Sequence, residues 1–290
     1  MKLGFIGLGI MGVPMAMNLR KAGFEVIVYN RTPAKTETLR SLGASVADSP
    51  KQVAAEAEII ITIVSDTPDV QDVLFGESGV AAGLTPGKIV VDMSTISPEA
   101  TKAFATKISA HGCELLDAPV SGGEPGAIAG TLTIMVGGSQ AAFEKCRAVF
   151  SAMGKNIVHT GPSGSGQCTK MVNQVICSLN IVAMTEGLLL AQRAGLDLAR
   201  TLQVVANGAA GSWMLTNLAP RILQNDFAPG FMMKLQQKDL RLAMELLAGA
   251  EEQFPGTKLA HQLFSHAVAL GLGAQGTQGL INAMPGSKEP

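Results

Sequence analysis

The sequence predicts two domains joined by a long helix: an α/β domain with a doubly wound, mostly parallel sheet over residues 1–163, and an all-α domain over residues 164–290. Three observations support this fold class. Short apolar runs alternate with helical stretches in the first half, a glycine-rich turn follows the first apolar run, and the strand pattern stops near residue 163. Strands that alternate with helices need crossover connections, so neighbouring strands are expected to run parallel with helices on both faces.

The expected strands are short apolar runs bounded by turn or helix signals. Pro14 near its start and Gly23 at its end bound the first helix, and Ser97 before Pro98 marks the start of another. The strands are predicted at 2–6, 25–29, 59–64, 89–92, 115–118, 132–136 and 157–160.

After the glycine-rich segment 161–166, the pattern is helical. Helices are predicted at 167–194, 197–207, 213–224, 236–252 and 256–270. The first would measure roughly 42 Å and carries apolar residues on most faces. Polar residues, Asn173, Asn180 and Glu186 among them, interrupt it, so we expect a buried helix shared between domains or subunits and not a membrane span.

The composition favours an oligomeric protein that acts on a small molecule. Charged residues make up 16% of the 290 residues, below the typical share of about 25%, so little charge is available to cover a monomer surface. We therefore expect a homodimer or homotetramer. The 22 basic and 23 acidic residues form no basic run, which argues against nucleic-acid binding.

The N-terminus and the cysteines indicate a cytoplasmic protein. Residues 1–7 become glycine-rich before they could form the apolar core of a signal peptide. Cys113, Cys146, Cys168 and Cys177 show no CxxC spacing, and a chain of this length needs no disulfides to fold. We expect these cysteines to be reduced.

A GxGxxG motif, Gly7-Leu8-Gly9-Ile10-Met11-Gly12, lies between the first strand and the first helix. In that context it predicts a Rossmann-type dinucleotide-binding turn, because the glycines allow a tight turn and the close approach of the backbone to a pyrophosphate. An ordinary flexible turn is the alternative.

The end of the second strand bears on the choice of nicotinamide cofactor. An NAD site is expected to place Asp or Glu there, to hold the ribose 2′-hydroxyl. This sequence has Asn30-Arg31-Thr32 instead, and a guanidinium can pair with a 2′-phosphate. NADP is therefore predicted, with NAD as the second choice; the alternative for Arg31 is a side chain that only faces solvent.

Two further motifs suggest a site for a carboxylate substrate. The segment Asp117 to Gly123 follows a strand at the sheet edge where open α/β sheets bind ligands, and its hydroxyl and unhindered N–H groups suit a carboxylate. Lys170 and Asn173 are three residues apart and share one helix face. Taken alone, the first motif is equally compatible with a simple turn, and Lys170 with a lysine that reaches out to water.

In their order along the chain, these motifs, together with Lys238-Asp239-Leu240, resemble the β-hydroxyacid dehydrogenase family, which includes 3-hydroxyisobutyrate dehydrogenases, tartronate semialdehyde reductases and glyoxylate/succinic semialdehyde reductases. The resemblance covers essentially the whole chain. It implies that Lys170 is the catalytic residue, that Asn173 orients the substrate, and that Ser121, Gly122 and Gly123 hold its carboxylate. The cofactor contacts it implies are Val64, Ser65, Thr95 and Lys238, beside the residues already named at 7–12 and 30–32.

The resemblance also implies the reaction. The segment from Ser121 to Pro125, together with the segment from Ala209 to Ser212, is most similar to the tartronate semialdehyde reductase branch. This similarity implies NADPH-dependent reduction of 2-hydroxy-3-oxopropanoate to glycerate with Lys170 as general acid. His111, His159, His261 and His266 show no metal-ligand spacing, so no metal is expected. Reduction of succinic semialdehyde or glyoxylate and oxidation of 3-hydroxyisobutyrate are the alternatives within the family. A catalytically silent NADP-binding sensor is the alternative outside it, and a ligand-free oligomeric scaffold is a third.

Overall fold

The structure is a computed structural model that describes residues 1–285. The chain divides into two compact units, Met1–Lys170 and Met171–Pro290. The division falls inside the long helix, after Lys170, whereas the sequence placed the domain boundary after residue 163. Residues 286–290 of the predicted second domain lie outside the described residues.

The first unit is the predicted α/β domain with a mostly parallel sheet. Its strands are β1 (Lys2–Ile6), β2 (Glu25–Tyr29), β3 (Ser45–Val46), β4 (Ile59–Thr62), β5 (Ile89–Asp92), β6 (Glu114–Asp117), β7 (Val120–Ser121), β8 (Leu132–Gly137) and β9 (Gly154–Gly161). Its helices are α1 (Gly12–Lys21), α2 (Glu37–Ser41), α3 (Pro50–Glu56), α4 (Thr67–Phe75), α5 (Pro98–Ser109), α6 (Gly123–Ala129) and α7 (Gln140–Met153), with 3₁₀ turns η1 (Pro33–Thr36) and η2 (Val80–Gly83).

The strand order is β3-β2-β1-β4-β5-β6-β8-β7, and β9 pairs with β8. All pairings from β3 to β6 are parallel, and β8 then runs antiparallel to β6 and β7. The order reverses at β1 and β4, which is the switch point where open α/β sheets bind ligands at the carboxyl ends of their strands.

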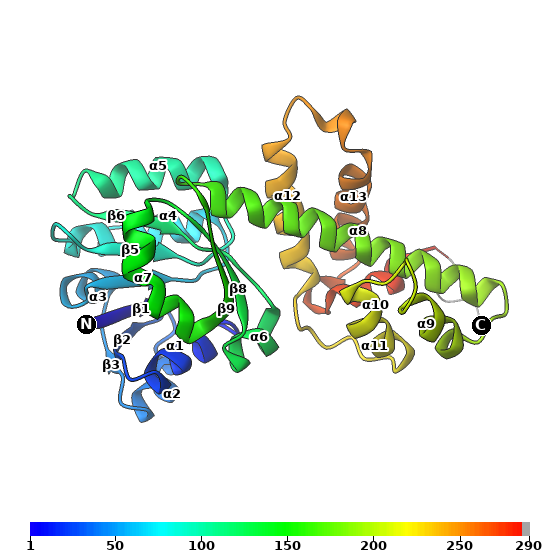
Figure 1. The fold of residues 1–290 in the computed structure, drawn as a ribbon, viewed down its shortest axis with the longest axis horizontal. Helices are drawn as coiled ribbons and strands as arrows, with labels where there is room; N and C mark the ends of the chain where they lie inside the picture. Colours follow the sequence, from blue (N-terminus) through cyan, green and yellow to red (C-terminus); the bar gives the residue numbers. More distant parts are fainter. Residues whose placement is uncertain (286–290) are drawn as a thin grey trace. The chain divides into compact units, whose positions relative to one another are not determined.

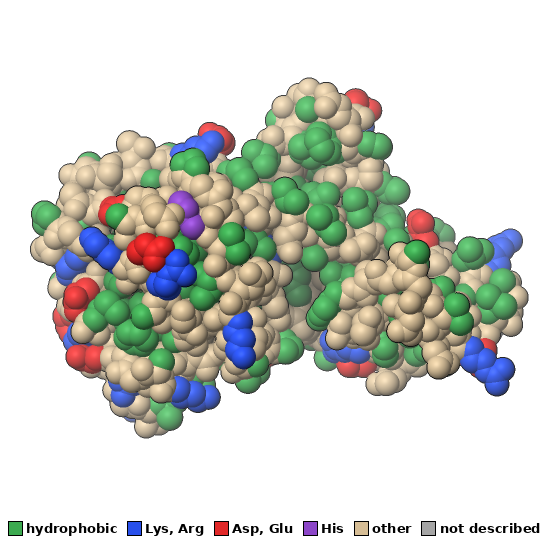
Figure 2. All heavy atoms as spheres, in the orientation of Figure 1, with side chains coloured by type: hydrophobic (Ala, Val, Ile, Leu, Met, Phe, Trp, Pro, Cys, Tyr) green, Lys and Arg blue, Asp and Glu red, His purple; other side chains and the backbone are tan. Residues whose placement is uncertain are grey.

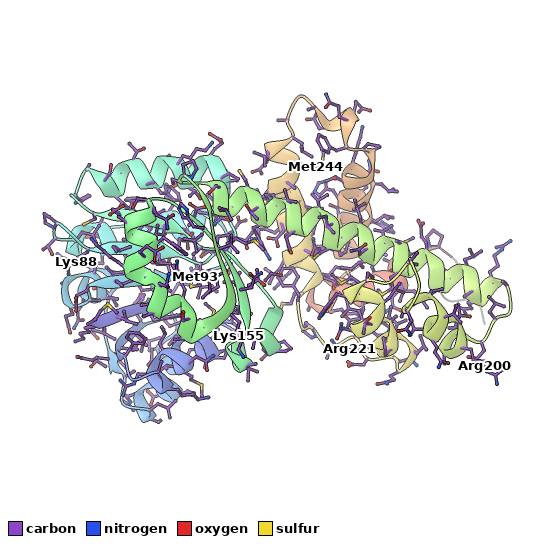
Figure 3. All side chains as sticks on the ribbon, in the orientation of Figure 1. Lys88, Met93, Lys155, Arg200, Arg221 and Met244 are labelled. Atoms are coloured by element: carbon purple, nitrogen blue, oxygen red, sulfur yellow. The ribbon has the colours of Figure 1, made fainter. Side chains whose placement is uncertain are left out.

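Both faces of this sheet are buried, which explains why its strands are continuous apolar runs. In β2, Val26 and Val28 pack into one core with residues of α1 and α7, and Ile27 packs into a second core with residues of α3, α4 and α5. Figure 1 shows α1 and α5 on opposite sides of the strands. Met93, which follows β5, is 1% exposed and lies inside the unit (Figure 3).

The differences from the predicted elements have local causes. The strands β3 and β7 have two residues each, too few to show an alternating pattern, and α6 begins at Gly123 in a segment predicted only as a turn. The single helix predicted over 213–224 is two short helices that meet at Leu218. Pro220 follows there, at the first turn of the second helix, where a missing N–H costs no hydrogen bond.

The second unit is helical within the described residues, as predicted. Its elements are the part of α8 (Ser165–Arg193) that follows Lys170, then α9 (Leu198–Val205), α10 (Trp213–Asn217), α11 (Ala219–Leu223), α12 (Met233–Leu246), α13 (Pro255–Ala269) and the 3₁₀ turns η3 (Glu251–Gln253), η4 (Leu272–Ala274) and η5 (Thr277–Ala283). Ile181, Met184 and Leu188 of α8 pack into one core with Leu240 and Phe264.

The helix α8 is long and apolar enough to meet the minimum for a bilayer span, with a mean hydropathy of 1.6 over 18 residues. The core helix of a folded domain meets the same test. Gln174, Ser178 and Thr185 of α8 are buried and hydrogen-bonded within the unit, which is the pattern of a core helix.

Candidate active site

The glycine-rich loop between β1 and α1 is held by backbone and side-chain hydrogen bonds. The Gly7 N–H donates to the Tyr29 carbonyl at 3.1 Å, and the Leu8 N–H donates to Asn30 Oδ1 at 2.8 Å. The loop is therefore anchored to the end of β2, the strand whose end was predicted to contact the cofactor.

The three motif glycines are required for different reasons. Gly7 has φ +102°, and a Cβ there would lie 2.1 Å from the Ile63 carbonyl oxygen. A Cβ on Gly12 would lie 1.9 Å from the Gly7 carbonyl oxygen. A Cβ on Gly9 would meet nothing within 4 Å, and Ile10 beside it is 49% exposed. The fold explains Gly7 and Gly12, whereas Gly9 leaves open space where a pyrophosphate can approach the backbone, so the loop fits a dinucleotide.

The end of β2 differs in detail from the sequence prediction. Asn30 uses its whole amide within the protein, since Oδ1 accepts from Leu8 and Nδ2 donates to the Thr32 carbonyl at 2.9 Å. Arg31 is 86% exposed at its side chain, with Nη1 3.7 Å from Asp69 Oδ1. Asn30 therefore shapes the loop, and Arg31 presents an exposed guanidinium next to it.

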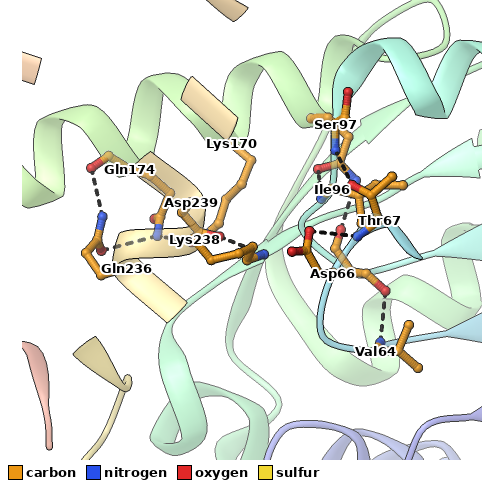
Figure 4. A network of polar contacts seen from close by, with 12 residues as sticks. Val64, Asp66, Thr67, Ile96, Ser97, Lys170, Gln174, Gln236, Lys238 and Asp239 are labelled. Atoms are coloured by element: carbon orange, nitrogen blue, oxygen red, sulfur yellow. Dashed lines mark hydrogen bonds and ion pairs between the residues drawn. The ribbon is translucent and has the colours of Figure 1, made fainter. Parts of the chain in front are cut away.

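Polar contacts join the carboxyl ends of β4 and β5, which are neighbours in the sheet. Thr62 Oγ1 and the Ser94 N–H both donate to Asp92 Oδ1, and the Val64 N–H donates to Ser94 Oγ at 2.9 Å. Figure 4 shows the contact at Val64. The predicted cofactor residues Val64, Ser65 and Thr95 thus belong to two strand ends that are hydrogen-bonded to each other.

Lys170 lies beside the predicted carboxylate loop. It is 6% exposed, and its Nζ donates to the Val120 carbonyl at 2.8 Å. Ser121 follows, and then Gly122 with φ +132° and Gly123 with φ +61°. Glycines tolerate these φ values and carry no side chain, so the N–H groups of this turn are open to an anion. The structure thus brings an ammonium and a candidate anion loop next to each other.

Asp117 was quoted in the sequence motif without a role, and the structure gives it one. Its side chain is fully buried at the end of β6, and its two carboxylate oxygens accept from the N–H groups of Gly164 (2.8 Å) and Gln167 (2.9 Å). It therefore caps the first turn of α8 from another element. Burial raises the pKa of Asp117 to about 6 despite these hydrogen bonds, which lower it.

The second unit holds the remaining predicted residues in a polar cluster between α8 and α12. Gln174 Nε2 donates to Asp239 Oδ2 at 2.5 Å, and Asn173 Nδ2 donates to Gln174 Oε1 at 2.7 Å. Asp239 is 1% exposed and pairs with Lys238 Nζ at 2.8 Å. Gln236 completes the cluster, with its Nε2 3.3 Å from the Gln174 carbonyl oxygen (Figure 4).

Sequence reasoning assigned no role to Gln174 or Gln236. The only signal for Gln174 was a polar residue in an apolar helix, and the only one for Gln236 was its position three residues before Asp239 on a helix. Both are nearly fully buried, so their amide groups depend on each other and on Asp239 for hydrogen bonds.

Comparison with known proteins shows to which family the chain is similar. Residues 2–161 match the family model of the NAD binding domain of 6-phosphogluconate dehydrogenase, and residues 164–284 match the model described as the NAD-binding domain of NADP-dependent 3-hydroxyisobutyrate dehydrogenase. The chain is 45% identical over 284 residues to the 2-hydroxy-3-oxopropionate reductase of Escherichia coli (strain K12), covering 98% of this chain and 97% of that protein.

Two further matches have other substrates in their names. The 2-(hydroxymethyl)glutarate dehydrogenase of Eubacterium barkeri is 39% identical over 281 residues, covering 97% of this chain and 93% of that protein. A solved structure of the Mycobacterium tuberculosis 3-hydroxyisobutyrate dehydrogenase with L-serine superposes with a TM-score of 0.89 at 30% identity, covering 98% of this chain and 99% of that one.

The fold, the dinucleotide loop and these matches define an NAD(P)-dependent oxidoreductase that acts on a CH–OH group. The chain belongs to the β-hydroxyacid dehydrogenase family, whose members include 3-hydroxyisobutyrate dehydrogenases.

Alanine substitutions at two of the glycines should separate binding from folding. Gly9→Ala should leave the free energy of unfolding within about 0.5 kcal/mol of wild type, because its Cβ meets no protein atom. It should weaken NADPH binding about tenfold or more, because the methyl group occupies the approach of the pyrophosphate.

Gly12→Ala should cost about 1–3 kcal/mol of stability, because its Cβ collides with backbone. Denaturant titration measures the free energy of unfolding of each variant, and NADPH fluorescence measures binding. Unchanged NADPH binding by Gly9→Ala would show that the pyrophosphate lies elsewhere.

Proposed function

We propose that this enzyme reduces 2-hydroxy-3-oxopropanoate to glycerate with NADPH, and that Lys170 is its general acid. The observation that carries the proposal is the buried Lys170 ammonium, 2.8 Å from the Val120 carbonyl and adjacent to the Ser121–Gly123 loop. The 45% identity to a 2-hydroxy-3-oxopropionate reductase supports the choice of substrate.

Lys170 provides the charge and the proton that carbonyl reduction needs. A bound NADPH supplies the hydride. As negative charge develops on the carbonyl oxygen, the ammonium stabilises it and transfers a proton from Nζ to that oxygen. One N–H of Lys170 is donated to Val120, which fixes the direction in which the other two point. In the direction of alcohol oxidation, the neutral amine would accept the same proton.

The Ser121–Gly123 loop is proposed to hold the substrate carboxylate. Its N–H groups and the Ser121 hydroxyl are donors, and its position after Val120 is next to the residue that Lys170 contacts. The loop proposed to bind the carboxylate and the ammonium proposed to protonate the carbonyl oxygen are adjacent, because Lys170 contacts Val120. A substrate that is held by the loop and reduced beside Lys170 must therefore be short. Asn173 is proposed to orient the substrate from α8, and Lys238 to contact the cofactor.

Oxidation of 3-hydroxyisobutyrate is the second candidate function. The match of residues 164–284 to a 3-hydroxyisobutyrate dehydrogenase domain and the TM-score of 0.89 favour it. Succinic semialdehyde and glyoxylate are further substrates of the same chemical class, a carbonyl near a carboxylate. A cofactor-binding sensor without activity would bind NADPH and turn over none of them.

The initial rate of NADPH oxidation should be fastest with tartronate semialdehyde among the four aldehydes tartronate, succinic and methylmalonate semialdehyde and glyoxylate. Lys170→Ala should lower kcat by about 10²–10⁴, the usual contribution of a general acid, with little change in NADPH binding. Lys155→Ala is the matched control, because this lysine is exposed on the same unit (Figure 3). Full turnover by Lys170→Ala would remove Lys170 from the mechanism, and NADPH binding without turnover of any aldehyde would favour the sensor.

We propose that NADP is preferred over NAD because of Arg31. Its side chain is 86% exposed and lies just after β2, beside the loop that Asn30 anchors. Residues 30–32 include no carboxylate that would repel a 2′-phosphate, and a guanidinium can pair with one. The description of the matched NADP-dependent domain supports this choice.

Arg31→Ala should weaken NADPH binding about tenfold, the value of one charge-assisted pair of hydrogen bonds, and leave NADH binding unchanged. The matched control is Arg40→Ala, an exposed arginine of α2 that pairs with Glu37. Titrations with both nucleotides measure the effect. Equal affinities of the wild-type protein for NADPH and NADH would contradict the proposal.

We propose that the protein assembles as a homodimer or homotetramer through α8. Val172, Ile176 and Leu190 lie on α8 with 60%, 55% and 67% of their surface exposed. Figure 2 shows hydrophobic side chains gathered over α8 and α12 with few charges among them. Exposed large side chains in one patch favour a protein interface, and a second copy would cover them.

Ile176→Glu should shift the mass measured by light scattering towards the monomer, since burying a charge in an apolar interface is costly. Leu42→Glu, at an exposed leucine after α2, is the control that should leave the mass unchanged. A monomeric wild type would contradict the interface. We also propose a cytoplasmic location, in keeping with four cysteines that form no disulfide within residues 1–285; cell fractionation tests it.

A further inference from the structure

Gln167, near the start of α8, binds two backbone groups with its side-chain amide. Its Nε2 donates to the Ser94 carbonyl at 2.8 Å, and its Oε1 accepts from the Ile96 N–H at 3.2 Å. The residue is fully buried. One amide therefore binds the backbone on both sides of Thr95, the residue that the family resemblance places beside the nicotinamide.

The backbone of Gln167 is held as firmly as its side chain. Its N–H donates to Asp117 Oδ2 at 2.9 Å, and the same carboxylate accepts from Gly164. A Cβ on Gly166 would lie 2.5 Å from the carbonyl oxygens of Asp117 and Met135, so α8 starts in direct backbone contact with β6 and β8. These contacts fix the position of the first turn of α8 relative to the sheet.

Lys170 lies three residues after Gln167 on the same helix, so the two share a face and are about 4.5 Å apart along the axis. The segment 94–96 follows β5 and Lys170 lies on α8, and the Gln167 amide joins the two elements through two hydrogen bonds. Hydride transfer requires the donor and the acid group to be placed on the carbonyl together, and small displacements cost rate.

We propose that Gln167 is a positioning residue that sets the place of Lys170 relative to the Ser94–Ile96 segment. This inference rests on the proposed function, because it assigns Gln167 a part in the same reaction. Gln167 does not touch the reacting atoms; it acts through Lys170 and Thr95.

An amide is well suited to this role. It supplies a donor and an acceptor at once, whereas a carboxylate supplies only acceptors and an ammonium only donors. Loss of the amide would leave the Ser94 carbonyl and the Ile96 N–H without this partner in a site where Ser94 and Ile96 are 2% and 1% exposed. The segment would then find a different arrangement, and the distance to Lys170 would change with it.

The test is Gln167→Met, which keeps the length of the side chain and removes both hydrogen bonds. Its matched control is Gln278→Met in the second unit. Gln278 is 1% exposed, and its Nε2 likewise donates to two backbone carbonyls, those of Asp226 and Ala228, at 3.1 Å. Gln167→Glu, which keeps one acceptor for Ile96, is the second variant should the methionine variant fail to fold.

Three readouts are measured on each protein: kcat and KM for the aldehyde, the deuterium isotope effect with NADPH labelled at the transferred hydrogen, and amide hydrogen exchange of the peptide around Ile96. Gln167→Met should lower kcat about tenfold or more with KM within about threefold, keep or raise the isotope effect, and speed exchange around Ile96. Gln278→Met should lose stability to a similar extent and keep kcat and the exchange of that peptide.

Two results overturn the inference. One is a Gln167→Met protein that folds and has wild-type kcat; the other is unchanged exchange around Ile96. An inactive wild type would overturn the proposed function instead, and the exchange experiment, repeated with and without NADPH, would still decide whether Gln167 holds the segment in place.

Discussion

The start of α8 depends on one buried carboxylate. Asp117 ends β6 inside the first unit and accepts two N–H groups from the first turn of the helix, which would otherwise be unpaired away from water. A charge in that position is costly, which is why its pKa rises to about 6, yet the hydrogen bonds that it makes define where the helix begins. Since Lys170 lies on the second turn, the place of the ammonium follows from this cap.

The dinucleotide loop shows how one motif combines folding and binding. Gly7 and Gly12 are there because the loop, β4 and α1 approach too closely for a side chain, and a folded protein without any cofactor would still need them. Gly9 has no such reason within the protein. The open space beside it is where a pyrophosphate could approach the backbone, so Gly9 is the glycine of the motif that relates to binding and not to folding.

Buried polar clusters hold the helices of both units. In the first unit, Gln167 and Ser94 connect α8 to the end of β5; in the second, Gln174, Gln236 and Asp239 connect α8 to α12 and hold Lys238. Such clusters are costly when any member lacks a partner, so they specify one arrangement of the helices that carry them. Each cluster lies next to residues that the family resemblance assigns to catalysis or to the cofactor.

The sequence by itself determined the fold class and most of the strands and helices, because these depend on local patterns: apolar runs, helix signals, and a glycine motif between a strand and a helix. The enzyme class followed from the resemblance of the ordered motifs to a known family. Only the tertiary structure decided what Asp117, Gln167, Gln174 and Gln236 do. Their partners are 47 to 73 residues away along the chain, and a buried glutamine or aspartate has no periodicity that would reveal its partner. Only the structure showed β7 and α6 as well, because such short elements depend more on their contacts with β8 and α1 than on a sequence pattern. It also showed that the Asn30 amide accepts a hydrogen bond from the dinucleotide loop.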